Sequence, residues 1–140
     1  MRKPPHYRLE DQVGFVLRQA QQRHAALFAS LMIEGLTPTQ WAALAKLTEV
    51  GACSQNKLGR LTAMDAATIK GVIDRLTARG LARGQADAGD GRRRLIELTA
   101  EGAEIYARGA SAAHEITART LAPLDEEERR VLVALLRRLT

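Results

Sequence analysis

The chain has 140 residues, of which 46% are hydrophobic and 26% are charged, a length and composition typical of one folded domain. Basic residues number 21 and acidic residues 16, so the formal net charge of +5 favours polyanionic partners. No apolar run approaches the roughly 18 residues of a membrane span, and no apolar segment follows the basic N-terminus as a secretory signal requires. The single cysteine, Cys53, excludes an internal disulfide. We therefore expect a cytoplasmic protein with no membrane partner.

Two helices are predicted in the first third of the chain. Apolar residues recur at three- and four-residue steps over residues 9–33, which predicts a long amphipathic helix that Gly35 can terminate. Thr37 can cap the next helix, and Pro38 suits its first position. This second helix is expected to end near Gly51.

Two further helices follow, joined by a tight turn. Ser54 can cap a short third helix, and a turn is expected at residues 62–64. A fourth helix is predicted over residues 65–79, with Gly80 as its stop. Its apolar face carries Ile69, Val72, Ile73 and Leu76.

The rest of the chain predicts two strands and two helices. Residues 81–86 and 92–98 are predicted strands, and the glycine-containing segment between them indicates a β-hairpin. Thr99 can cap a long helix that Pro123 breaks, and a last helix is predicted from Asp125.

This order of elements predicts a mainly α (α+β) fold, a winged helix-turn-helix in which the hairpin is the wing. We expect a single domain over residues 1–140, with residues 36–98 as its DNA-binding part and residues 9–34 and 99–140 as dimerisation helices. The terminal helices carry leucine-rich stripes that a chain of this size would struggle to cover alone, which favours a homodimer.

The positive charge is concentrated in the middle of the chain. Residues 54–94 contain nine basic and four acidic residues, so this segment holds the whole net charge of +5. For any single arginine, the plainer interpretation is a solvated surface residue with no role in binding. An excess confined to a predicted helix-turn-helix and wing nevertheless indicates a nucleic-acid footprint.

The fourth helix is the expected recognition helix, because small residues on its outward face permit close approach to the major groove. Thr68, Lys70 or Arg75 can hydrogen-bond bases, and the start of the third helix can contact a phosphate. The residues predicted to contact double-stranded DNA from these two helices are Ser54, Gln55, Lys57, Ala66, Ala67, Thr68, Lys70, Gly71 and Arg75.

The wing adds a second predicted DNA contact. Arg92, Arg93 and Arg94 follow a turn that contains two glycines, and an arginine there can enter a narrow minor groove. Asp90 is expected to orient one of these arginines through an ion pair.

Several segments resemble the MarR-type family of regulators. Residues 36–44 (LTPTQWAAL) resemble the helix that opens the winged-helix domain of that family, and residues 58–81 resemble its helix-turn-helix. Residues 87–93, with the spacing D-x-x-D-x-R-R, and residues 98–102 resemble its wing and the start of the next helix. One position departs from the pattern, since Gly89 stands where many members carry an arginine.

The resemblance implies a homodimer joined through the first helix and the last two. It also implies binding to pseudo-palindromic operators and release by a small molecule, often an aromatic acid. Two recognition helices of such a dimer would lie about 34 Å apart, one turn of DNA. Residues 7–15 and 61–65 also resemble the subgroup that represses nicotinate degradation, which implies a hydroxylated nicotinate as inducer.

Three residues are candidates for binding the effector, each with a plainer alternative. His24 lies on the apolar stripe of the first helix, where it is either a core or interface histidine or a donor to a carboxylate or ring nitrogen. Arg18 is either an anion partner or an exposed side chain. Trp41 either packs in the core or forms the pocket wall that the resemblance implies.

Other classes of function have weaker support. Cys53 allows a redox-responsive regulator, since some members of the family sense peroxides, and the following helix and Lys57 would lower its pKa. The chain has no HExxH, CxxC, P-loop or GxSxG motif, and its three histidines lack metal-ligand spacing. We therefore expect no enzyme, no metal and no cofactor. An aromatic content of 4% argues against a base-stacking RNA-binding protein.

Overall fold

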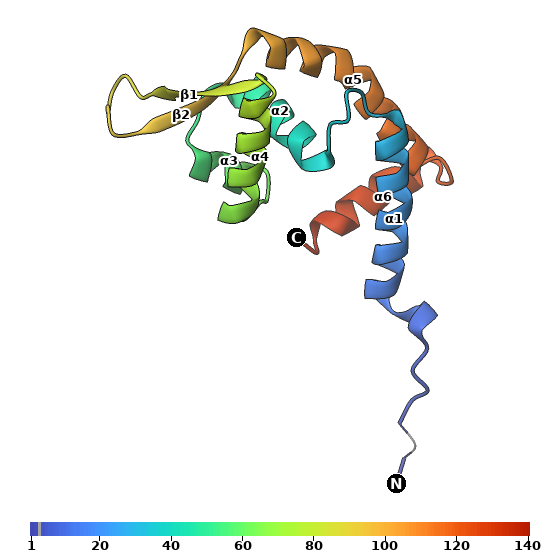
Figure 1. Cartoon of the computed structure of the whole chain (residues 1–140). Helices are drawn as coiled ribbons and strands as arrows, with labels where there is room; N and C mark the ends of the chain where they lie inside the picture. The colour runs from blue at the N-terminus through green and yellow to red at the C-terminus, as the bar shows by residue number, and fades with distance from the viewer. Residues whose placement is uncertain (3) are drawn as a thin grey trace. The chain divides into compact units, whose positions relative to one another are not determined.

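The computed structural model describes residues 1–2 and 4–140, which form six α-helices, a short 3-10 helix and two strands (Figure 1). The chain divides into two compact units, one made of Met1–Leu31 with His114–Thr140 and the other of Met32–Ala113. No helix in the described part combines the length and the apolar character needed to cross a membrane.

The unit Met32–Ala113 contains the helix-turn-helix and the wing. Figure 1 shows α3 and α4 next to one another, with the β1–β2 hairpin beside them. The predicted winged helix-turn-helix is therefore confirmed. The elements of this unit are α2 (Pro38–Val50), α3 (Gln55–Leu61), α4 (Ala66–Ala78), β1 (Ala82–Ala86), β2 (Arg94–Leu98) and the first part of α5 (Ala100–Thr120).

Short polar side chains begin these helices where the sequence predicts. The Thr37 hydroxyl accepts the Gln40 N–H at 3.3 Å, and the Gln40 side chain accepts the Thr37 N–H at 3.2 Å, which forms a capping box at the start of α2. The side chains of Ser54 and Asp65 cap α3 and α4. Each cap satisfies backbone donors that the first turn of a helix leaves unpaired.

Helices α2, α3 and α4 pack around a shared apolar core. Its largest fully buried side chains are Leu44, Leu58, Ile69, Val72 and Leu76. Helix α3 lies close to α4 at Gly59, where an added Cβ would be 3.1 Å from Ile69 Cγ2 and 3.2 Å from the Met64 carbonyl oxygen. A residue without a side chain at this position allows the two helices of the helix-turn-helix to lie this close.

The wing is anchored to the segment before α3. Strands β1 and β2 pair antiparallel, and Ile96 on β2 also exchanges two backbone hydrogen bonds with Cys53, of 3.1 and 2.7 Å. The second strand is shorter than predicted because residues 87–93 form turns closed by their own backbone. In this loop the Asp87 N–H donates to the Arg93 carbonyl at 2.8 Å. Arg92 and Arg93 therefore lie in the loop and not in a strand.

The other unit contains η1 (Leu9–Asp11), α1 (Val13–Leu31), the end of α5 and α6 (Glu126–Arg137). The prediction of a continuous helix from residue 9 is wrong, because Gln12 is extended (φ −89°, ψ 131°) and separates η1 from α1. The Gln12 side chain donates to the Arg8 carbonyl at 2.8 Å, a local bond that competes with helix formation.

Most apolar side chains of this unit are exposed in the single chain. Helix α1 buries only Phe28, and α6 buries none of its residues. The exposed large apolar residues on η1, α1 and the C-terminal segment are Leu9, Val13, Val16, Leu17, Val131, Val133, Leu135, Leu136 and Leu139.

Candidate nucleic-acid interface

Helix α4 has one buried face and one exposed face. The buried face is the predicted one and carries Ile69, Val72, Ile73 and Leu76. The predicted DNA-contacting residues lie elsewhere on the helix: Ala66, Ala67, Thr68, Lys70 and Arg75 are exposed, and Gly71 is half-buried. Asp65 Oδ1 accepts the Thr68 N–H at 2.7 Å, and this bond holds the pKa of the Asp65 carboxyl below its ordinary value.

Two basic side chains on α4 have different surroundings. Lys70 Nζ lies 2.8 Å from Asp74 Oδ2, and this hydrogen bond and the aspartate charge raise the pKa of Lys70. The guanidinium of Arg75 lies back over Gly71, where an added Cβ would be 3.2 Å from Arg75 Nη1. The charge of Lys70 is thus partly offset by its neighbour, while Arg75 extends over the middle of the helix.

The start of α3 carries three of the predicted contact residues. The Ser54 hydroxyl accepts the Lys57 N–H at 3.2 Å, so Ser54 caps the helix. Gln55 is half-buried and lines a hollow of about 310 Å³ that Arg94 of the wing also lines. The structure thus brings together one residue from α3 and one from the wing. The Lys57 side chain is exposed.

The wing loop corrects the predicted role of Asp90. Its carboxylate accepts the backbone N–H of Arg92 at 3.1 Å, and its carbonyl accepts the Arg93 N–H at 3.0 Å. Among the described residues no salt bridge joins Asp90 to an arginine of the wing. The expected ion pair is therefore absent there, because Asp90 shapes the turn through its neighbours' backbone.

The strands of the wing hold two arginines in different ways. Arg83 Nε donates to Glu97 Oε1 at 2.7 Å, and Gln85 donates to the other oxygen of Glu97 at 2.9 Å. The guanidinium of Arg94 lies over Gly84, where an added Cβ would be 2.8 Å from Arg94 Nη2. Gly84 therefore lets Arg94 lie across the strand pair.

Most of the basic side chains in this unit form no salt bridge within the part of the chain that the structure describes. Of the nine basic residues in the segment 54–94, only Lys70 and Arg83 form salt bridges with other described residues. Arg79 instead donates to the Glu34 carbonyl at 2.8 Å. The basic residues without a described salt bridge include Lys57, Arg60, Arg75, Arg92, Arg93 and Arg94. Such a surface attracts a polyanion.

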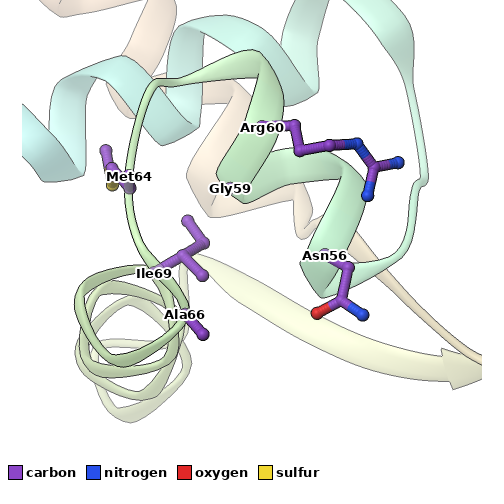
Figure 2. A pocket seen from close by; sticks show the side chains of 6 residues that line it. All are labelled: Asn56, Gly59, Arg60, Met64, Ala66 and Ile69. Atoms are coloured by element: carbon purple, nitrogen blue, oxygen red, sulfur yellow. The ribbon is translucent and has the colours of Figure 1, made fainter.

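Two polar residues of α3 lie outside the predicted set. Asn56 and Arg60 are exposed and line a hollow of about 220 Å³ between α3 and α4. Figure 2 shows the two side chains one helical turn apart on α3, with Ala66 and Ile69 of α4 opposite Asn56. Their four-residue spacing within the predicted third helix places both side chains on one face, and this pattern could have identified them from the sequence.

His24 is half-buried on α1 and bound to the end of α5. The Thr120 hydroxyl donates to the Ile116 carbonyl at 2.8 Å, so it is left to accept at its 2.9 Å contact with His24 Nδ1. The hydrogen of a neutral His24 therefore lies on Nδ1, and Nε2 carries the lone pair. Arg23 beside it donates to two carbonyls at the same helix end, at 2.6 and 2.7 Å.

The other two effector candidates have ordinary packing environments. Arg18 is exposed, and its guanidinium carbon lies 5.5 Å from the centre of the Phe15 ring. Trp41 is half-buried and stacks on Tyr106, with ring centres 5.0 Å apart. An added Cβ at Gly109 would lie 2.6 Å from the Trp41 ring, so α5 packs directly against it. The contacts described for Arg18 and Trp41 neither support nor contradict a role in ligand binding.

Cys53 is buried, and its environment differs from the predicted one. Burial raises the pKa of the Cys53 thiol, and the opposing effect of the Lys57 charge is smaller. The expected lowering of its pKa by the following helix and Lys57 is therefore wrong, because desolvation of the thiolate dominates. In the described part of the chain, no cluster of three or more His, Cys, Asp or Glu residues could hold a metal ion.

Known proteins with similar sequences and structures are regulators of transcription. The family model for the MarR family matches residues 34–93. The HTH-type transcriptional repressor NicR of Pseudomonas putida is 37% identical over 134 residues, which are 95% of this chain and 85% of that protein.

Two solved structures are similar over nearly their whole length. A probable transcriptional regulator from Pseudomonas aeruginosa is 58% identical, with a TM-score of 0.91 over 95% of this chain and 100% of that one. Bordetella bronchiseptica BpsR, described for the regulation of its DNA binding by 6-hydroxynicotinic acid, is 38% identical, with a TM-score of 0.91 over 96% of each chain. The chain belongs to the MarR family of winged helix-turn-helix transcriptional regulators.

Proposed function

We propose that this protein is a homodimeric repressor that occupies a pseudo-palindromic operator and leaves it when a hydroxylated nicotinate binds. The observation that carries the proposal is the unpaired positive charge around α3, α4 and the wing. The similarity to NicR, which is named as a transcriptional repressor, supports repression of transcription as the role of this protein. The similarity to BpsR, whose DNA binding is described as regulated by 6-hydroxynicotinic acid, supports the class of effector.

In this proposal α4 lies in the major groove and the wing approaches the minor groove. The small side chains of Ala66 and Ala67 and the glycine at position 71 allow close approach, and Thr68, Lys70 and Arg75 contact base edges. Ser54, Gln55 and Lys57 hold the DNA backbone, and Arg92, Arg93 and Arg94 enter or border the minor groove. Residues 36–98 are thus the proposed DNA-binding part of the chain.

The terminal helices are the proposed dimer interface, within residues 9–34 and 99–140. The apolar side chains exposed on α1 and α6 support this assignment, since monomeric proteins seldom expose contiguous apolar patches of that kind. A two-fold dimer presents two copies of α4 to successive turns of a duplex, which suits a pseudo-palindrome.

Arg18, His24 and Trp41 are the proposed effector-binding residues. With its Nδ1 hydrogen donated to Thr120, a neutral His24 offers an acceptor at Nε2, in place of the donor expected from the sequence. That acceptor suits the hydroxyl or ring N–H of a hydroxylated nicotinate, whereas the guanidinium of Arg18 suits a carboxylate.

Operator selection followed by calorimetry tests the proposal. The purified protein is first used to select duplexes from fragmented genomic DNA, and binding to the selected operator is measured with increasing 6-hydroxynicotinate. We expect saturable binding of both the operator and the ligand, and release of the DNA by the ligand. Nicotinamide, which lacks the carboxylate and the hydroxyl, is the control ligand. No heat of binding together with unchanged operator affinity would remove the proposed effector.

A further inference from the structure

We infer that Asn56 and Arg60 on α3 form a contact site for one phosphodiester group of the DNA backbone, beside the recognition helix. This inference rests on the proposed function, because it assigns further residues to the same DNA-binding surface. It adds two residues to the predicted contacts of α3, Asn56 between Gln55 and Lys57 and Arg60 one helical turn further on.

The two side chains are free to bind an anion together. They are four residues apart on α3, so they share one face of the helix. Both are exposed, and neither forms a side-chain hydrogen bond or a salt bridge with another residue in the described part of the chain. Arginine offers several N–H donors in one plane, and the asparagine amide offers two more. This combination of donors and one positive charge suits the paired oxygens of a phosphate group.

The hollow beside these side chains places them at the start of α4. Its lining includes Gly59 and Ala66, the first residue of α4 (Figure 2). Gly59 keeps α3 this close, because any Cβ there would meet the Met64 carbonyl oxygen at 3.2 Å. Asn56 and Arg60 are therefore held next to the helix that enters the groove.

The geometry of a helix-turn-helix then identifies the partner of these side chains. When the second helix lies in the major groove, the first helix crosses the sugar-phosphate backbone. Here α3 is that first helix, so polar side chains that extend from it beside Ala66 meet the backbone and not the base edges. The contact is sequence-independent and contributes through the charge of the phosphate.

The salt dependence of DNA binding by Arg60→Ala tests this inference. Each lost phosphate contact reduces the slope of log K against log salt by about 0.9. A dimer that loses two contacts should therefore show a slope about 2 units less negative than that of the wild type. We expect a loss of roughly tenfold in affinity, equal for the operator and for a scrambled duplex. Asn56→Asp, which adds a negative charge, should weaken binding at least as much.

The control variant is Arg8→Ala, which removes the same charge from the segment before η1, where Arg8 pairs with Asp11. It should bind with the wild-type slope. An Arg60→Ala protein that binds with wild-type affinity and slope would overturn the inference and leave the proposed function intact. A loss confined to the operator would overturn it as well, since it would show that Arg60 reads bases. A wild-type protein that binds no duplex would overturn the proposed function and the inference together.

Chemical removal of single phosphate charges gives a second test that does not depend on how the variant folds. Operator duplexes with one neutral methylphosphonate at successive positions are titrated with wild-type protein and with Arg60→Lys, which keeps the charge. We expect several positions to weaken the wild type, and at one of them in each half-site we expect Arg60→Lys to be weakened less than the wild type. A scan with no such position would contradict the inference. In a further control, inorganic phosphate is added at constant ionic strength. If it displaces the wild-type protein from DNA but does not displace Arg60→Ala, the site binds a free anion and the inference is contradicted.

Discussion

Asp65 and Cys53 have pKa shifts in opposite directions, and each shift has one main cause. The Thr68 N–H stabilises the charged form of Asp65, whereas burial destabilises the charged form of Cys53. Asp65 caps the start of α4, and Cys53 lies in the backbone bridge to the wing. Both shifts lead to measurable pH dependence.

The cap at Asp65 should stabilise the protein only where its carboxyl is ionised. Its pKa is lowered in the folded state, so its contribution to stability is present above the pKa of the unfolded chain and is lost as the pH falls through the folded value. We expect Asp65→Ala to lower the urea midpoint at pH 7 and to have a smaller effect at roughly pH 2. Asp65→Asn, which still caps the helix, is the matched control, and its urea midpoint at pH 7 should fall less than that of Asp65→Ala. An Asp65→Ala midpoint equal to the wild type at pH 7 would contradict the role of the cap.

Cys53 should react slowly and only at alkaline pH. Its raised pKa keeps the thiol protonated at neutral pH, and burial restricts access to it. We expect slow labelling by a thiol reagent in the folded protein, fast labelling in urea, and the same operator affinity before and after peroxide. Peroxide-dependent release that Cys53→Ser abolishes would restore the redox alternative.

At the scale of elements, the junction between the wing and α5 depends on a close backbone contact. The Thr99 hydroxyl accepts the Gly102 N–H at 3.0 Å, as predicted for a helix cap. An added Cβ at Gly102 would lie 2.0 Å from the Leu81 carbonyl oxygen, and a backbone atom cannot move aside cheaply. Helix α5 can therefore start this close to Leu81, the residue before β1, only with glycine at position 102.

Gly102→Ala should destabilise the protein by on the order of 1–3 kcal/mol through overpacking. Gly91→Ala is the matched control, since nothing lies within 4 Å of a Cβ there and its backbone is not in the left-handed region, and alanine lowers the conformational entropy of the unfolded chain relative to glycine. The free energy of unfolding measured in urea should fall for the first variant and stay equal or rise for the second. Equal stability of the Gly102→Ala protein and the wild type would contradict the contact.

The wing loop should contribute to operator affinity through Arg92. Arg92→Ala is expected to cost on the order of 1–3 kcal/mol if the side chain reads a groove. Lys57→Ala should instead weaken binding to all duplexes and flatten the salt dependence, as expected for a phosphate contact. Fluorescence anisotropy with the operator and a scrambled duplex at fixed salt separates the two effects. An unchanged dissociation constant for Arg92→Ala would exclude its role in the groove.

Local signals were enough to predict most elements. The caps at Thr37, Ser54 and Thr99 each accept a backbone N–H three residues away, so the sequence alone identifies them, whereas the cap at Asp65 was not predicted. The apolar spacing likewise predicted which face of α4 is buried. The start of α1 at Val13 was missed, since apolar periodicity does not report a bond such as that from Gln12 to Arg8.

The parts that could not be predicted depend on distant or competing contacts. The partner of His24 is Thr120, which is 96 positions away in sequence. The pKa of Cys53 depends on how far the fold buries its thiol. The partner of Asp90 could not be predicted because several donors lie near it in sequence, and it accepts the backbone N–H of Arg92. Charge spacing predicted a basic surface, but only the structure shows that Lys70 is paired while Arg60 lies beside a hollow.

At the scale of the whole molecule, the exposed leucines of α6 and of the residues just after it should be covered by a second copy of the chain. Leu135 and Leu139 are 51% and 69% exposed in the single chain. A double substitution of both by glutamate should convert a dimer to a monomer in sedimentation velocity, because charges do not fit an apolar interface. Ala134→Glu, on the side of α6 that carries Arg130 and Arg137, should remain dimeric. A double variant with wild-type sedimentation would exclude α6 from the interface.

The stoichiometry of the complex with the selected operator tests the central claim most directly. A titration well above the dissociation constant, monitored by fluorescence anisotropy at low salt, should saturate at two protomers per duplex. Deleting either half-site should reduce the affinity sharply. Saturation at one protomer per duplex, or no saturable binding to double-stranded DNA in dilute buffer, would contradict the account.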